Sequence, residues 1–177
     1  MFSQTATTIG RTILFAIPVT IMFNDLVGSV AFVAGPSMQP ALNPTGAEAR
    51  DVVLINKLAI KQGWLNRGDV IVLDSPQRRK QQIVKRLIGL PGDWVKTRSG
   101  ELKHVPKGKV WIEGDNQEFS CDSDRYGAIP ISMVRAKVST IVWPPSRWGD
   151  VADDRKDKQR LFISNDQGND FPRRRRD

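Results

Sequence analysis

The stretch IVKRLIGLPGD at residues 83–93 has the pattern of a buried β-strand that ends in a tight Pro-Gly turn. Successive side chains of a strand alternate between its two faces, so Lys85 and Arg86 point in opposite directions. Both faces are otherwise aliphatic, as in a strand that is covered on both sides. A lone lysine in a strand ordinarily faces water, but here we expect at least one of the two cations to be desolvated. Because burial lowers the pKa of an amine, Lys85 is a candidate general base.

The chain as a whole has the size and composition of one globular domain. It has 177 residues, of which 40% are hydrophobic and 26% charged, and a formal net charge of +8. The positive charge is compatible with nucleic acid, an anionic membrane surface or simple solubility, and does not decide among them. Cys121 and His104 are the only residues of their types. They exclude an intramolecular disulfide and predict no metal site, and His104 lies in a turn-rich setting typical of the surface.

Residues 12–34 form an apolar segment with a single charge, Asp25. About 20 apolar residues in a helix cross a bilayer core, so we expect residues 1–34 to hold a membrane anchor and a lead-in strand. The helix is expected to stop before Gly28. No basic segment with a small-residue cleavage site precedes it, which favours a retained anchor over a removed signal peptide. A core helix of a soluble protein is the alternative. An acid within the bilayer is costly, so Asp25 is expected near an interface or against a partner.

Residues 50–143 have the short apolar runs and frequent turn residues that are typical of β-structure. Short Val/Ile/Leu-rich runs (DVVLINKLAI, GDVIVLDSP, QQIVKRLIGL, DWVKTRSG, KVWIEGD and AKVSTIVW) are mostly separated by Gly, Pro, Asn or Asp. This spacing predicts a mainly β fold, a sandwich or a partly open barrel. Residues 75–82 are expected to form an exposed loop or hairpin tip. Residues 150–177 are rich in charge and poor in apolar side chains, which predicts a disordered tail; its terminal RRRR is weak support for nucleic-acid binding.

Ser37 lies in a Gly- and Pro-rich stretch, AGPSMQPALNP, at residues 34–44. Serine in such a turn is usually an ordinary turn residue. It becomes a nucleophile only if a nearby base removes its proton, and His104 alone supports no Ser-His-Asp set. A neutral lysine can be that base. Lowering its pKa from about 10.4 to near 7 costs roughly 4 kcal/mol, which burial in an apolar strand layer can supply. Lys85 lies where this is possible.

Four motifs in register give the chain a resemblance to a known family. In order and form, GPSMQPAL (35–42), RGDVIV (67–72), KRLIGLPGD (85–93) and GDNQEFSCDSDRYG (114–127) resemble the type I signal peptidase family. More narrowly, LNP (42–44), WPPSRW (143–148) and the short connection from Asp93 to Gly114 are similar to the mitochondrial inner membrane branch of that family. The resemblance covers roughly residues 12–149 and excludes the tail.

The resemblance implies a signal-peptidase-like, partly open β-barrel catalytic domain over residues 35–149, with a Ser/Lys dyad. Ser37 would be the nucleophile, with its backbone N–H donating to the oxyanion, and Lys85 the general base. Supporting residues would be Ser120, which orients the Lys85 amine, and Arg86, Asp115 and Asp122, which tie the motif segments together by charge pairing. Which of the two acids meets Arg86 is left open.

The resemblance also implies a shallow apolar pocket that accepts small residues before the cut. Its lining would be Val33, Gly35, Met38, Ile83 and Val84, although ordinary core packing explains the apolar members equally well. Two positions depart from the family pattern. Gly35 stands where many bacterial relatives have a hydroxyl residue that completes the oxyanion hole, so no second donor is predicted. Asp124 stands where family members often have an arginine, which weakens the expectation of a salt bridge there.

The function implied is a membrane-anchored serine endopeptidase that removes hydrophobic sorting or signal peptides, without cofactor or metal. Implied partners are precursor proteins, a related catalytic subunit and membrane lipid, but not nucleic acid. The implied location is the mitochondrial inner membrane, crossed once, with the catalytic domain in the intermembrane space. Three alternatives stay open: a bacterial-type signal peptidase I, a self-cleaving repressor, and a non-catalytic basic membrane adaptor. The repressor would need an N-terminal DNA-binding module, and the adaptor would not need Ser37 and Lys85.

Overall fold

The computed structural model describes residues 28–44, 50–78, 80–152 and 161–162, together with Leu14, residues 16–18, Met22 and Asn24. The isolated N-terminal residues in this set are helical. None of the helices in the described part of the chain is long and apolar enough to cross a membrane. The predicted anchor, with Asp25, lies largely outside the described residues, and so does most of the predicted C-terminal tail.

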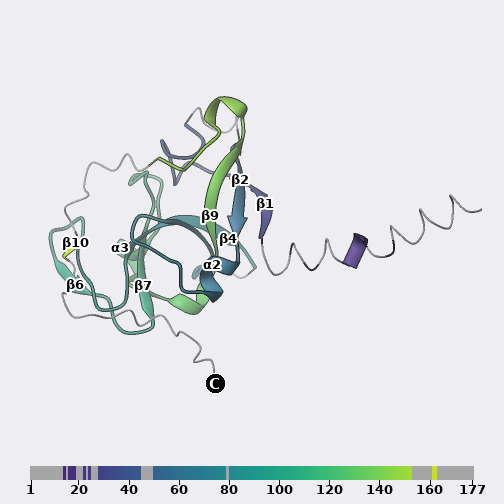
Figure 1. Cartoon of the computed structure of the whole chain (residues 1–177). Coiled ribbons are helices and arrows are strands. Elements are labelled where there is room, and N and C mark those ends of the chain that lie inside the picture. Colours follow the sequence, from purple (N-terminus) through teal and green to yellow (C-terminus); the bar gives the residue numbers. More distant parts are fainter. Residues whose placement is uncertain are drawn as a thin grey trace, which may run out of the picture.

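An antiparallel seven-stranded sheet forms the body of the molecule and curls into an open half-barrel (Figure 1). Its order is β1-β2-β9-β3-β4-β7-β8, with bounds β1 Gly28–Phe32, β2 Val52–Asn56, β3 Val70–Asp74, β4 Gln82–Gly89, β7 Lys109–Glu113, β8 Ile129–Pro130 and β9 Val134–Trp143. A three-stranded sheet has the order β10-β5-β6, with bounds β5 Trp94–Lys96, β6 Leu102–His104 and β10 Leu161–Phe162. The helical elements are α2 Leu58–Lys61, α3 Ser123–Tyr126, η1 Ile131–Met133 and η2 Pro145–Arg147. The prediction of a mainly β, partly open barrel is confirmed.

Strand β4 is central in the sheet and is covered on both faces. It pairs with β3 on one side and β7 on the other, and residues 85–89 are all buried. Lys85 is 3% exposed and Arg86 1% exposed, so both cations are desolvated. The predicted Pro-Gly turn follows, with Gly92 at φ +91° and the Leu90 N–H donating to Asp93 Oδ2 at 2.8 Å.

Two segments differ from the strands that the sequence predicts. The second half of DVVLINKLAI is helix α2, because the Asn56 side-chain oxygen accepts the Ala59 N–H at 3.1 Å and turns the chain out of the strand. In the predicted tail, residues 161–162 form β10, which pairs with β5 through Leu161–Val95 and Phe162–Trp94. The loop or hairpin tip predicted at 75–82 lies between β3 and β4, and its described residues 76–78 and 80–82 are exposed, although Gln82 already begins β4.

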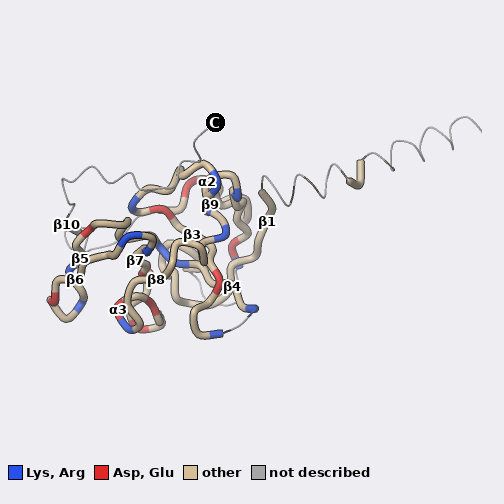
Figure 2. Tube along the Cα trace, turned by 90° about the horizontal axis from the view of Figure 1, so that it is seen from below, with Lys and Arg blue, Asp and Glu red and all other residues tan. Residues whose placement is uncertain are grey.

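Three apolar clusters form the core. Two lie on opposite faces of the curled sheet, and a smaller one packs under β5 around Trp111 and Val105. Val33 and Met38 belong to the first cluster, so the turn that carries Ser37 is fixed to the core on both sides of the serine. Charges of both signs are spread over many elements of the described chain (Figure 2).

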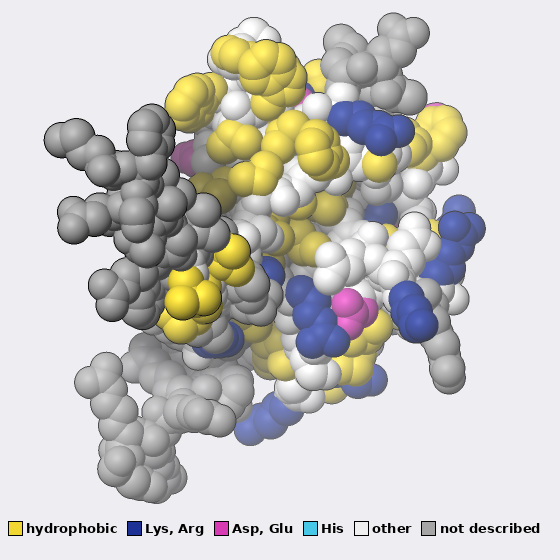
Figure 3. Space-filling view, turned by 90° about the vertical axis from the view of Figure 1, so that its right-hand side faces the viewer, with side chains coloured by type: hydrophobic (Ala, Val, Ile, Leu, Met, Phe, Trp, Pro, Cys, Tyr) yellow, Lys and Arg dark blue, Asp and Glu magenta, His cyan; other side chains and the backbone are white. Residues whose placement is uncertain are grey.

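One face of β1, β2 and β9 exposes apolar side chains. Cross-strand pairing places Phe32 beside Val52 and Val52 beside Trp143, and it places Val30 beside Leu54. Hydrophobic side chains gather on this side of the molecule (Figure 3). The most exposed members are Phe32 at 75%, Val30 at 58% and Trp143 at 57%, with Trp148 at 74% nearby in sequence.

Candidate active site

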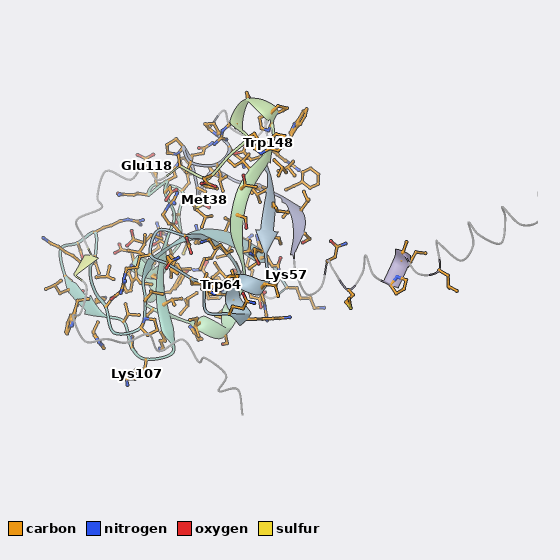
Figure 4. The ribbon with its side chains drawn as sticks, viewed as in Figure 1. Met38, Lys57, Trp64, Lys107, Glu118 and Trp148 are labelled. Carbon is orange, nitrogen blue, oxygen red and sulfur yellow. The ribbon has the colours of Figure 1, made fainter. Side chains whose placement is uncertain are left out.

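Ser37 lies in a turn between β1 and β2, at one end of the curled sheet. Gly35 has φ +92°, a conformation that favours glycine. The ring of Pro36 restricts the φ of the residue that follows Gly35. Met38 is 1% exposed and anchors the turn in the core. The Ser37 carbonyl accepts the backbone N–H of Asn116 at 3.1 Å, which joins the first and fourth motifs. Figure 4 shows Met38 and Glu118 at the same end of the molecule, in agreement with this contact.

Lys85 projects from β4 into a polar cluster formed by the fourth motif. Its Nζ donates to Ser120 Oγ at 2.8 Å. Burial lowers the pKa of the Lys85 amine, against the opposing effect of the nearby Asp122 carboxylate, and the Arg98 guanidinium lowers it further. A neutral amine near physiological pH is therefore more accessible at Lys85 than at a solvated lysine.

The Ser120 hydroxyl has its proton directed away from Lys85. Ser120 Oγ donates to Asp122 Oδ2 at 2.7 Å, and the Gly114 N–H donates to the same oxygen at 3.0 Å. Asp122 has no exposed surface. Because the single proton of Ser120 is used on Asp122, Ser120 can only accept from the Lys85 amine. A neutral Lys85 then keeps its lone pair for another proton.

Arg98 is part of this cluster and was missed in the sequence analysis. It lies in the β5–β6 turn, and its Nη2 is 3.1 Å from Asp122 Oδ2 and 3.7 Å from Glu113 Oε2. Asp124 Oδ1 accepts the Arg98 backbone N–H at 3.0 Å. Asp124, the position that departs from the family pattern, thus holds the backbone of the turn that brings an arginine to Asp122. The unexpected acid at position 124 was a sign that this segment has a different partner, but nothing in the local sequence identifies Arg98, 26 residues earlier, as that partner.

Arg86 pairs with Asp115, which settles the choice that the sequence left open. Its Nε and Nη2 donate to the two carboxylate oxygens at 2.8 and 2.6 Å, a bidentate arrangement. Arg86 also donates to the carbonyls of Gly68 and Ala152. It therefore joins β4 to the second and fourth motifs, whereas Asp122 pairs with Arg98 and not with Arg86.

A cleft of about 590 Å³ runs past Ser37 and Lys85. Its lining includes every residue predicted for substrate binding, namely Val33, Gly35, Met38, Ile83 and Val84. The lining also includes residues that the sequence analysis did not place there, among them Phe32, Ser75, Pro76, Gln77, Arg78, Phe119, Cys121 and Tyr126. The cleft thus lies between the Ser37 turn and the N-terminal half of β4, closed at one side by the fourth motif.

Gly114 separates the two halves of the site, which gives a prediction. A Cβ at this position would lie 2.5 Å from the Ser37 carbonyl oxygen and closer still to Ser120 Oγ. We expect Gly114→Ala to displace one or both, with a loss of about 1–3 kcal/mol in the free energy of unfolding. Peptide cleavage by the folded fraction should also fall. Thermal denaturation and kinetics check this beside Ser132→Ala, an exposed control; a variant as stable and active as the control would contradict it.

The chain belongs to the signal peptidase family. The model described as "Signal peptidase, peptidase S26" matches residues 6–103. With the curled β-sheet, this makes the protein a serine peptidase of the signal peptidase type, and the enzyme is favoured over the non-catalytic adaptor.

The narrower resemblance is confirmed by similar proteins. The chain is 43% identical over 135 residues to mitochondrial inner membrane protease subunit 2 of Danio rerio, covering 75% of this chain and 74% of that one. It is 42% identical over 138 residues to subunit 2 of Saccharomyces cerevisiae, covering 75% and 78%. Subunit 1 of Schizosaccharomyces pombe is 36% identical over 150 residues, covering 76% and 91%. A solved signal peptidase I from Enterococcus faecalis matches with 24% identity and a TM-score of 0.37, covering 42% of this chain and 97% of that one.

Proposed function

We propose that the protein is a membrane-anchored endopeptidase that removes hydrophobic sorting peptides by a Ser/Lys dyad, with Ser37 as nucleophile and Lys85 as general base. The observation that carries the proposal is a buried lysine with a lowered pKa that lines the same cleft as a serine in a core-anchored turn. Membership of the signal peptidase family supports the class of reaction.

Acylation begins when neutral Lys85 Nζ takes the proton of Ser37 Oγ. The oxygen attacks the scissile carbonyl carbon, and the carbonyl π electrons move to oxygen. The Ser37 backbone N–H is the proposed donor to this oxyanion, and such donors are worth about 10²–10³ in rate. Gly35 has no side chain that could supply a second hydrogen-bond donor to the oxyanion. When the C–N bond breaks, the Lys85 ammonium gives its proton to the leaving amine and is neutral again.

Deacylation repeats the same proton transfers with water as nucleophile. Lys85 takes a proton from water, hydroxide adds to the ester carbonyl, and the C–O bond to Ser37 breaks. The Lys85 ammonium then returns a proton to Ser37 Oγ, which restores the starting enzyme. Ser120 holds the amine in place during both half-reactions because it can only accept from it.

Cleavage after small residues is the specificity that the cleft supports. Val33 and Met38 are core residues whose surfaces also reach the cleft, and Ile83 and Val84 lie on its other side. An extended peptide laid between the Ser37 turn and β4 would direct side chains toward this apolar lining, with backbone hydrogen bonds supplying affinity. Bulky side chains next to the scissile bond are expected to be poor substrates.

The inner mitochondrial membrane, with the catalytic domain in the intermembrane space, is the proposed location. The relatives are named as proteases of that membrane. The exposed apolar face of β1, β2 and β9, which carries Trp143, supports a position against lipid or a partner. A related subunit 1 is the proposed catalytic partner, because the chain is similar to both subunits of the protease.

The test is cleavage of a precursor-derived peptide by the full chain in detergent, alone and with subunit 1 added. We expect one cut, after a small residue, when the products are identified by mass spectrometry. A peptide with tryptophan in place of that small residue is the matched control and should resist cleavage. Absence of cleavage even with subunit 1 present would contradict the proposal.

Arg98 gives a prediction specific to the base. Its charge lowers the pKa of Lys85 and opposes Asp122, so Arg98→Met should raise that pKa. At a pH below the pKa, a rise of one unit reduces the neutral fraction about tenfold. The rise of kcat with pH should therefore move to higher pH, with activity recovered in alkali. Arg98→Lys, which keeps a charge, should shift the profile less. A profile that keeps its midpoint in Arg98→Met would contradict this role.

A further inference from the structure

Two motifs that mark the narrower resemblance, LNP and WPPSRW, have no role in the chemistry described so far. They are nevertheless joined in the structure. Asn43 from the first and Arg147 from the second both bind Asp51, which lies just before β2. Asn43 is 3% exposed and Asp51 1% exposed, so this polar group is buried.

Asn43 and Asp51 bind each other reciprocally. The Asn43 N–H donates to Asp51 Oδ2 at 2.7 Å, and the Asp51 N–H donates to Asn43 Oδ1 at 2.7 Å. Asn43 has φ +53°, a left-handed conformation that asparagine tolerates better than most residues. Arg147 donates through Nη1 to the Asp51 carboxylate and through Nη2 to the Ala41 carbonyl at 2.6 Å.

The same group fixes both ends of the Ser37 turn. At the entry, the Val33 N–H donates to the Asp51 carbonyl at 2.9 Å and the Val33 carbonyl accepts Asn43 Nδ2 at 3.0 Å. At the exit, Arg147 holds the Ala41 carbonyl. The turn between them carries Ser37, so its position relative to the sheet depends on contacts made at Asp51.

We propose that Asn43, Asp51 and Arg147 form a clasp that positions Ser37 for attack. This inference rests on the proposed function, in which Ser37 is the nucleophile. The three are positioning residues, because they act through the backbone of the turn. Among the described residues, the charged groups that shift the pKa of Lys85 are Asp122, Cys121, Arg98 and Asp115, and none of them belongs to the clasp. Loosening the clasp should therefore displace the nucleophile without changing the base.

Arg147→Met and Asn43→Ala test the clasp in the full chain. Misplacement of a reacting group by about 1 Å can cost about 10²-fold in rate, so we expect kcat to fall by about 10- to 100-fold in each variant. KM should change less, and the pH midpoint of kcat should stay at the parental value. Both substitutions loosen the same turn and share Asp51 as a partner, so the double variant should lose clearly less than the product of the two single losses. Kinetics are measured at a temperature where circular dichroism shows each variant folded.

Arg135→Met is the matched control, because Arg135 also pairs with an aspartate, Asp74 at 2.8 Å, but on the exposed surface. It should keep the parental kcat. If Arg147→Met does not fold, Arg147→Lys replaces it, since one ammonium cannot span the carboxylate and the carbonyl as the guanidinium fork does. Two results would overturn the clasp: a parental kcat in a folded Arg147 variant, or losses that multiply in the double variant. If Ser37→Ala is inactive in the same assay, the proposed function still stands. Activity in Ser37→Ala would instead overturn the proposed function, and the clasp with it.

Discussion

Replacing Ser37 with alanine is expected to reduce peptide cleavage to background in a protein that is otherwise folded. The substitution removes the oxygen that is proposed to form the acyl bond, and loss of a nucleophile in a comparable serine protease costs about 10⁶ in kcat. Ser37 is half-buried in a turn fixed by Met38 and by the Asn116 contact, so the loss of one oxygen should leave the turn in place. Initial rates with a precursor-derived peptide, beside thermal denaturation, measure both effects.

Cys121 supplies the control for this experiment. Its thiol is another nucleophilic side chain that lines the cleft, and its Sγ accepts from Gln77 Nε2 at 3.0 Å. Cys121→Ser should retain cleavage within a few-fold of the parent. The account would be contradicted if Ser37→Ala still cleaved the peptide while Cys121→Ser did not, because the nucleophile would then be the thiol.

Lys85→Met is expected to abolish cleavage as completely as the loss of Ser37, because it removes the proposed base, the buried amine that lines the same cleft as Ser37. The methionine side chain is similar in length and apolar, so it suits a buried site in β4. Burying an ionisable amine opposes folding at any pH below the pKa of the unfolded lysine, so the variant should be at least as stable as the parent. Thermal denaturation separates this outcome from a loss of activity through unfolding.

The pH dependence of the parent follows from the same residue. The folded pKa of Lys85 is below its ordinary value of 10.5, and as the proposed base it can act only when neutral. Cleavage should therefore rise with pH through this lowered pKa and be lost as the pH falls below it. The same shift makes stability fall as the pH drops from 10.5 to the lowered folded pKa, since the unfolded chain binds the proton more tightly, and below that pKa the loss is complete. General bases usually titrate within a few pH units of neutrality. A kcat that does not change between about pH 5 and pH 9 would therefore contradict this assignment.

The burial of Lys85 could be predicted because its signal is local. An aliphatic run on both faces of a strand implies cover on both sides, and β4 is covered in this way. The Pro-Gly turn at 91–92 could be predicted for the same reason, since its conformation depends on its own residues. The contact between Lys85 and Ser120 was predicted from the family resemblance and not from the strand pattern of residues 83–89.

The missed features depend on partners that are distant in sequence. Arg98, in the β5–β6 turn, meets Asp122 from 24 residues away, and Arg147 meets Asp51 from 96 residues away. Neither arginine carries a local mark that separates it from a solvated cation. The Val/Ile/Leu content of residues 51–60 predicts a strand throughout, but the side chain of Asn56 turns the chain into helix α2. In each case a tertiary or side-chain hydrogen bond decided what composition left undetermined.

The central claim is that Ser37 forms an acyl intermediate with Lys85 as its base, and trapping that intermediate tests it most directly. A precursor-derived peptide ester is mixed with the full chain and quenched in acid within the first turnover, and the digest is sequenced by mass spectrometry. We predict the acyl group on Ser37 in the parent and no adduct in Ser37→Ala or Lys85→Met. An adduct on Cys121, or cleavage with no adduct on Ser37 at any quench time, would contradict the account.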